Sequence, residues 1–260
     1  MYKNGDGVAV DFTQAIYWYK KSAEQGNADS QFILSIAFDM GWGGVVKDIK
    51  QVSFWRKKSA EQGNVDAQTL LAHDYFIENN FNQAIYWYKK LAEQGNKVNK
   101  SAEYIIGTMF ESGNGVQKDL TQAIYWYEKS AEQGDKEAQM RLAISYEEGS
   151  GVKKDPQKAI YWYEKSAEQG NAKSQEILGF SYLLGTSIIE KDYKKALFWL
   201  KKSAEQDDER AQVVVGGIYE EGLGVAVNYK EAANWYKKAS EQGNVDATSK
   251  YKSLKARRLI

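Results

Sequence analysis

One phrase around tryptophan recurs along this chain at a nearly constant interval. Ala-Ile-Tyr-Trp-Tyr occurs four times, and looser copies of it occur three times. The tryptophans of these copies are Trp18, Trp55, Trp87, Trp126, Trp162, Trp199 and Trp235. Their successive spacings are 37, 32, 39, 36, 37 and 36 residues. A period of this length indicates a repeat architecture in which each unit covers the apolar face of its neighbour.

Each unit contains two helical patterns, and the second of them, helix B, carries the tryptophan. Helix B follows a residue whose side-chain oxygen can cap the free backbone N–H groups of a first turn. The predicted caps are Asp11, Asp48, Asn80, Asp119, Asp155, Asp192 and Asn228. Glycine, which adopts the left-handed conformation easily, closes the helix at Gly26, Gly63, Gly95, Gly134, Gly170 and Gly243. The sixth copy has Asp207 at this place, so we expect a turn that is either strained or closed in a different way.

The first pattern, helix A, begins at a second series of caps. These are Asn27, Asn64, Asn99, Asp135, Asn171, Asp208 and Asn244. Ala138, Leu142 and Tyr146 illustrate a spacing of four residues that places them on one face of a helix. Glycine-rich turns such as Gly149-Ser150-Gly151-Val152 join helix A to helix B. The sequence therefore predicts an all-α fold, a right-handed α/α solenoid of about seven helix–turn–helix repeats of ~36 residues each.

Stacked repeats form one continuous core, so we expect residues 1–260 to be a single solenoid and not two globular domains. Met1-Tyr2 aligns with the end of a helix A, which predicts a first repeat truncated at its helix A and an upstream segment in a longer parent protein. Residues 244–260 are predicted to form a C-terminal capping helix, because their many lysines and arginines make a polar end.

Composition argues against several classes of function. The 35 basic residues equal the 35 acidic ones, so the chain has no net charge to attract nucleic acid or an anionic membrane. There is no cysteine, and His73 is the single histidine. No apolar run of about 18 residues could insert in a membrane. We therefore expect no nucleic acid, no membrane insertion, no metal, no cofactor and no catalytic residue, and a hydrolase is the least favoured class.

The order Leu-Gly/Ala-x-x-Tyr, Gly-x-Gly-Val, Asp-x-x-x-Ala-x-x-Trp-Tyr-x-Lys-x-Ala-x-Gln-Gly resembles the Sel-one-like repeat (SLR) family, a relative of the tetratricopeptide repeat. The resemblance covers essentially the whole chain, and the near-identical copies look bacterial. The chain departs from the family's repeat pattern at the short turn 77–80, at Asp207 and at Thr186-Ser187-Ile188-Ile189. Members act as adaptors in assembly, signalling and host interaction, and some bacterial members neutralise secreted phospholipase toxins as immunity proteins.

By analogy with tetratricopeptide repeats, two fixed positions of helix A are expected to line a concave groove. Counting the small residue as position one, these are positions three and seven, with further residues one turn later. The predicted partner-binding residues are Phe32, Ile36, Met40, Thr69, His73, Phe76, Tyr104, Thr108, Met140, Ile144, Phe180, Leu183, Leu184 and Val213. An alternative reading is that tight curvature buries these residues inside the solenoid. The tryptophan row is interpreted as packing between repeats.

Trp42 lies outside the tryptophan register, in the turn Gly41-Trp42-Gly43-Gly44, and it completes the predicted contact residues because exposed tryptophans favour interfaces. The favoured function is a scaffold or adaptor that binds a segment of another protein in the groove. The alternative is a dedicated inhibitor of one toxin or effector. Both predict a monomer in the periplasm or the cytoplasm, and the sequence does not choose between these compartments.

Overall fold

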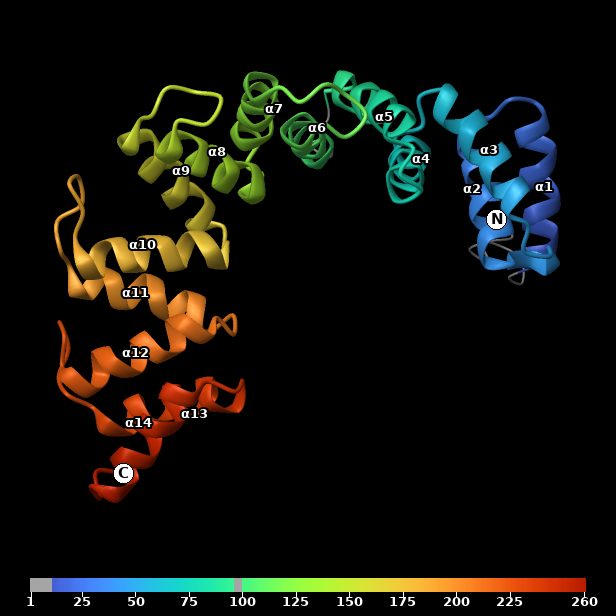
Figure 1. Ribbon diagram of the computed structural model, residues 1–260. Helices are drawn as coiled ribbons and strands as arrows, with labels where there is room; N and C mark the ends of the chain where they lie inside the picture. The colour runs from blue at the N-terminus through green and yellow to red at the C-terminus, as the bar shows by residue number, and fades with distance from the viewer. Residues whose placement is uncertain (1–10, 96–99) are drawn as a thin grey trace. The chain divides into compact units, whose positions relative to one another are not determined.

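The computed structural model describes residues 11–95 and 100–260, and within these residues the chain is helical and forms no strand (Figure 1). Contacts divide it into two compact units, Met1–Ala123 and Ile124–Ile260, which are described separately. The α-helices of the first unit are α1 (Phe12–Glu24), α2 (Ala28–Met40), α3 (Ile49–Glu61), α4 (Val65–Ile77), α5 (Phe81–Glu93) and α6 (Lys100–Ser112). The remaining helices are α7 (Leu120–Glu132), α8 (Lys136–Glu148), α9 (Pro156–Glu168), α10 (Ala172–Leu184), α11 (Tyr193–Ala204), α12 (Glu209–Glu221), α13 (Tyr229–Glu241) and α14 (Val245–Ala256).

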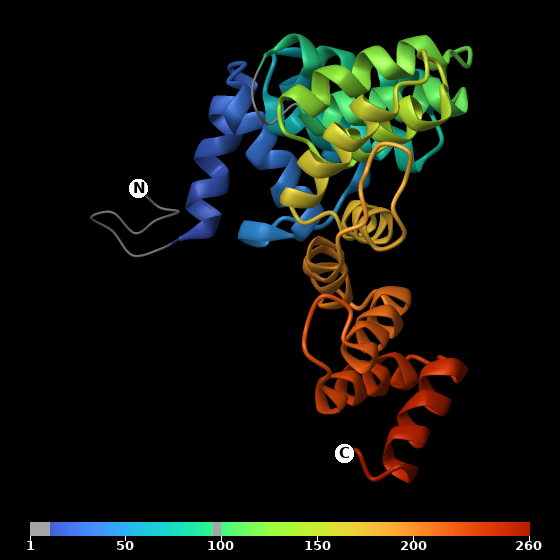
Figure 2. The same cartoon turned by 90° about the vertical axis from the view of Figure 1, so that its left-hand side faces the viewer.

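Helix A and helix B alternate as predicted, and each helix packs mainly against its neighbours in the sequence. The pairs α2–α3 and α4–α5 belong to the first unit, and α8–α9, α10–α11 and α12–α13 to the second. Figures 1 and 2 show the helices of each unit stacked side by side. This packing is that of an all-α solenoid, in agreement with the prediction.

Small residues on helix A allow the next helix B to come close. Gly179 of α10 and Gly216 of α12 illustrate the constraint: a Cβ atom at these positions would lie 2.5 Å from Leu200 Cγ and 2.6 Å from Tyr236 Cε1, respectively. Contacts of this length are too short for carbon atoms, so glycine is required there.

Most of the predicted caps form. Asp155 Oδ1, for example, accepts a hydrogen bond from the backbone N–H of Lys158 at 3.1 Å. The prediction is wrong at Asn80, whose side chain makes no capping hydrogen bond, because the short turn before α5 gives its backbone a different conformation. Asn99 lies outside the described residues. At Asp207 the expected strained closure is present, since this residue has φ of 66° where the other repeats have glycine.

A ladder of buried glutamines joins consecutive repeats. In one step, Gln139 Nε2 donates to Ala131 O at 3.0 Å, and Gln139 Oε1 accepts from Gln169 Nε2 of the next repeat at 2.6 Å. The equivalent pairs are Gln31 with Gln62, Gln68 with Gln94, Gln175 with Gln206, and Gln212 with Gln242. One glutamine of each pair is buried, so its amide must find a partner within the protein, and a less buried glutamine of the neighbouring repeat supplies it.

The tryptophan row packs between repeats in most but not all copies. Trp55, Trp87 and Trp235 are buried. Trp126, Trp162 and Trp199 are half-buried, whereas Trp18 is 56% exposed. Packing between repeats therefore explains most of the row, and that interpretation is wrong for Trp18, which has much of its ring in solvent.

Candidate protein-binding surface

The helix A residues of the first unit that were predicted to bind a partner lie at its surface to different degrees. Phe32 and Ile36 of α2 are half-buried, as are Phe76 of α4 and the two α6 residues Tyr104 and Thr108. Met40, Thr69 and His73 are exposed. The first unit therefore presents a mixed apolar and polar surface on its A helices.

The second unit presents a more apolar helix A surface. Met140 and Ile144 of α8, Phe180 and Leu183 of α10, and Val213 of α12 are all half-buried. Leu184 at the end of α10 is 70% exposed. The inner parts of Phe180 and Leu183 pack against the core cluster that contains Leu200 and Val215. These side chains thus support the core and still leave apolar surface accessible.

Glu176 occupies the same fixed position of α10 but is 97% buried, with a relative exposure of 3%. Its carboxylate is neutralised by two cations, Arg210 at 3.0 Å and Lys173 at 2.5 Å. The Arg210 guanidinium also lies 5.2 Å from the centre of the Phe180 ring. A buried carboxylate is costly unless paired, so Arg210 is held in place between Glu176 and Phe180. Sequence reasoning did not anticipate this pair because its members lie on different helices.

In the first unit, Arg56 of α3 is likewise a buried charged residue that the sequence did not reveal as buried. Its side chain is only 7% exposed, and it forms salt bridges to Asp39 of α2, at 3.5 Å, and to Asp74 of α4. Its Nε atom is buried without a hydrogen-bond partner. These groups line a depression of about 300 Å³ together with Ile49 and Leu71. The substitution of arginine for the repeat's usual tyrosine was visible in the sequence, but its partners were not.

Trp42 is exposed, as predicted from its glycine flanks, at 43% of its surface. It begins a short 3₁₀ turn, Trp42–Gly44. Met40 before this turn is also exposed, at 54%. Val46 and Ile49 follow at 83% and 73%, and sequence reasoning did not select either of them. The segment from the last residue of α2 to the first residue of α3 therefore carries four exposed apolar side chains.

Two acidic residues at the ends of A helices serve the packing of the next repeat. Glu147 Oε2 accepts a hydrogen bond from Tyr163 Oη at 2.7 Å, and Glu220 Oε2 accepts one from Tyr236 Oη at 2.8 Å. Burial of the two phenols raises the pKa of Tyr163 and of Tyr236, and the adjacent carboxylates raise each pKa further. These glutamates therefore have a structural role in the contact between repeats.

Among the described residues, no group of three or more histidine, cysteine or acidic side chains is arranged to hold a metal ion. No described helix combines the length and the apolar character needed to cross a membrane.

Paired helices, glutamine ladders and a repeated helix A surface define an α/α solenoid repeat protein. The Sel1 repeat matches residues 1–27, 28–64, 65–96, 100–135, 136–171, 172–208 and 210–244, so the chain belongs to the Sel1 repeat family. Sel1 repeats generally mediate protein–protein interaction, and the fold is typically a non-catalytic scaffold.

Two solved structures are similar over nearly the whole chain. One is c5321, a protective antigen present in uropathogenic Escherichia coli strains that displays an SLR fold; it has 36% identity and a TM-score of 0.81, over 98% of this chain and 55% of that one. The other is a Sel1 repeat protein from Oxalobacter formigenes, with 31% identity and a TM-score of 0.78, over 97% of this chain and 73% of that one. The chain thus spans about half the length of the Escherichia coli protein. No functionally curated protein matches the chain.

Proposed function

We propose that this chain is a protein-binding adaptor that holds a partner segment against the surface of its A helices. The observation that carries the proposal is the set of half-buried apolar side chains at the two fixed positions of helices α8, α10 and α12, where Glu176 and Gly217 are the exceptions. This set contains Met140, Ile144 and Phe180. Partly exposed apolar side chains that share one surface are a common feature of protein interfaces.

The charges beside this set indicate the chemistry of the partner segment. Arg210 extends over Phe180 with 71% of its side chain exposed, while its charge partner Glu176 is buried. Lys173 adds a second exposed cation on the same helix A surface. An apolar segment that also carries a carboxylate would match this part of the surface.

The experiment is a capture of partners from bacterial lysate and from periplasmic extract with the chain as bait, identified by quantitative mass spectrometry. Ile144→Glu and Phe180→Glu place charges on the proposed surface. Tyr161→Glu and Phe198→Glu are matched controls, because these aromatic side chains are about half exposed on B helices. We expect the A-helix variants to lose a partner that the B-helix variants retain, with the helical circular dichroism unchanged.

The opposite pattern, in which a partner is lost only with the B-helix variants, would contradict the proposal. The number and identity of the captured proteins then refine it. Several partners would indicate a general adaptor, whereas one stoichiometric toxin or effector would indicate a dedicated inhibitor.

A further inference from the structure

The turn between α10 and α11 is built differently from the glycine-rich turns of the other repeats. Thr186 Oγ1 accepts hydrogen bonds from the backbone N–H groups of Ile188, at 3.3 Å, and Ile189, at 3.0 Å. The backbone N–H of Thr186 donates to Ile189 O at 2.8 Å. These bonds close a compact turn in which Ile189 is 6% exposed and Ile188 is 42% exposed. The turn therefore holds Ile189 in the core and leaves Ile188, the residue before it, partly exposed to solvent.

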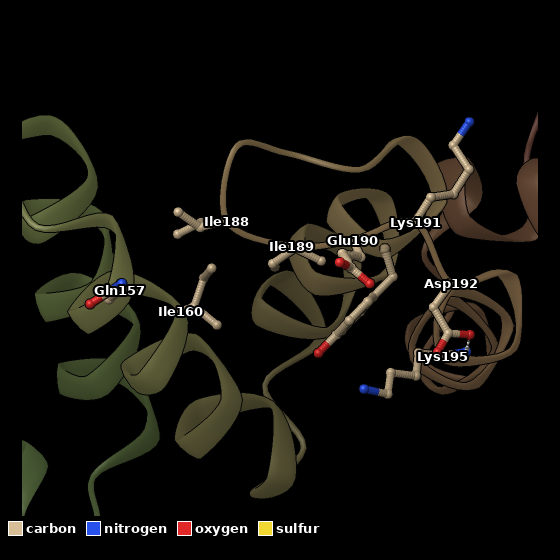
Figure 3. A pocket seen from close by; sticks show the side chains of 9 residues that line it. Gln157, Ile160, Ile188, Ile189, Glu190, Lys191, Asp192 and Lys195 are labelled. Carbon is tan, nitrogen blue, oxygen red and sulfur yellow. Dashed lines mark hydrogen bonds between the residues drawn. The ribbon is translucent and has the colours of Figure 1, made fainter.

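Two depressions lie on either side of Ile188. One of about 440 Å³ lies between Gln157 and Ile160 of α9 and the turn, with Tyr182 of α10 also in its lining. The other, of about 460 Å³, extends along the turn between α8 and α9 and includes Val152. The two share Gln157 and Ile188. Figure 3 shows Ile188 of the turn and Ile160 of α9 among the side chains that line the first depression.

Positive charge surrounds this apolar shelf. The two depressions are lined by five lysines, Lys153, Lys154, Lys158, Lys191 and Lys195. They are lined by only three carboxylates, those of Asp155, Glu190 and Asp192, which leaves an excess of two positive charges on a chain with no net charge. Asp155 and Asp192 each have one oxygen bound to backbone N–H groups as helix caps. The local charge therefore favours an anionic occupant.

Two of the lysines are held in place by aromatic rings. The Lys158 ammonium lies 5.1 Å from the centre of the Tyr146 ring, and the Lys195 ammonium lies 5.1 Å from the centre of the Tyr182 ring. Since a lysine lies over each ring, it competes with a nucleic acid base for stacking there. The apolar shelf also has no role in binding a phosphate backbone. Both points favour a peptide over a nucleic acid.

We infer that this surface, the lysine shelf around Ile188, binds a short acidic peptide segment of a partner protein. One apolar side chain of the segment packs against Ile188 and Ile160, and carboxylates on either side of it pair with the lysines. The lysine shelf is formed by the turns that join A helices to B helices, so it is a second site, separate from the helix A surface and independent of the proposed function.

The test is fluorescence anisotropy of the full chain with a labelled eight-residue peptide of alternating glutamate and leucine. We expect Lys158→Glu combined with Lys195→Glu to weaken binding about tenfold. We expect Ile188→Asn to weaken it about fivefold, because the exposed isoleucine loses its apolar contact. Replacement of leucine by serine in the peptide should have a similar effect to Ile188→Asn, and binding should weaken as salt is added.

Matched controls come from other turns of the chain. Val227→Asn changes a valine that is 50% exposed on the turn between α12 and α13, and Lys118→Glu reverses an exposed lysine on the turn before α7. Both should leave peptide binding within about twofold of the unaltered chain, as should Ile144→Glu on the helix A surface. The inference is overturned if the peptide does not bind, if the serine peptide binds equally well, or if a single-stranded oligonucleotide of equal charge competes as effectively.

Discussion

The same position of helix B is filled in two different ways in α3 of the first unit and in α9 and α13 of the second. In the second unit Tyr163 and Tyr236 are buried there, and each donates a hydrogen bond to a glutamate at the end of the preceding helix A. In α3 of the first unit Arg56 takes this place and pairs with Asp39, at the position equivalent to those glutamates, and also with Asp74, whereas α5 of the same unit keeps a buried tyrosine, Tyr88. The repeat therefore keeps a polar connection between helices and changes its chemistry from a neutral hydrogen bond to a charge pair.

This difference has an energetic consequence. A phenol is neutral and can be buried at modest cost, whereas a buried guanidinium requires compensating carboxylates. Asp74 occurs where the second unit has Ser145 in α8, Ser181 in α10 and Ile218 in α12, so the extra carboxylate accompanies the extra charge. Helix α3 consequently depends on an ion network at a place where α9 and α13 depend on packing and one hydrogen bond.

The largest expected effect is that of Arg56→Ala. Loss of the guanidinium leaves Asp39 and Asp74 without their cation and opens a cavity, so the free energy of unfolding should fall by about 3 kcal/mol. Urea denaturation followed by circular dichroism measures it. Arg56→Tyr introduces a phenol that can donate a hydrogen bond to Asp39, as Tyr163 does to Glu147, and should recover part of the loss. An Arg56→Ala variant as stable as the parent chain would show that the network contributes nothing.

A smaller effect is expected at high pH. Tyr88 of α5, at the same helix B position, has its pKa raised by burial to about 12. A tyrosine in the unfolded chain loses its proton near pH 10. Below that pH, Tyr88 is therefore protonated in both the folded and the unfolded state. Between about pH 10 and 12 only the folded chain retains it, and the free energy of unfolding therefore falls as pH rises. Unfolding measured across this window should depend less steeply on pH in Tyr88→Phe than in the parent chain.

Tyr163→Phe tests the hydrogen bond that the neutral phenol of Tyr163 donates to Glu147. It removes one hydroxyl and its hydrogen bond, while the exposed Glu147 carboxylate is rehydrated, so the loss should be about 1 kcal/mol. Comparison of this value with that of Arg56→Ala, both from urea denaturation, measures directly how the two chemistries differ. Equal losses would contradict the distinction drawn between the two units.

The smallest expected effect concerns the ends of the B helices. Asp207 has φ of 66° where Gly170, in the preceding repeat, has φ of 84°. Glycine adopts this conformation without steric cost, so Asp207→Gly should raise the free energy of unfolding by about 0.5 kcal/mol. Gly170→Ala, as the reverse change, should lower it. A rise in thermal midpoint for Asp207→Gly and a fall for Gly170→Ala would confirm the comparison.

Much of the fold was predictable from the sequence. The spacing of the tryptophans gave the repeat, and the caps and glycines located the helix ends, with Asn80 as an error caused by a shortened turn. The candidate binding surface was predictable only in outline. Most of the fixed positions of helix A are half-buried or exposed, whereas Glu176 at one of them is buried and Trp18 in the supposed core row is exposed.

The sequence by itself determined the repeat, the two helices in each unit and the places where the backbone must turn left-handed. These features depend on residues within about four positions of each other, so a local pattern is enough to specify them. Only the tertiary structure decided which charges are buried and what neutralises them, as for Glu176 with Arg210 and for Arg56 with Asp39. The tertiary structure also decided that Ile188 is partly exposed to solvent while Ile189 is buried. The physical reason is that burial and pairing are set by side chains of neighbouring repeats, which come together only when the helices pack.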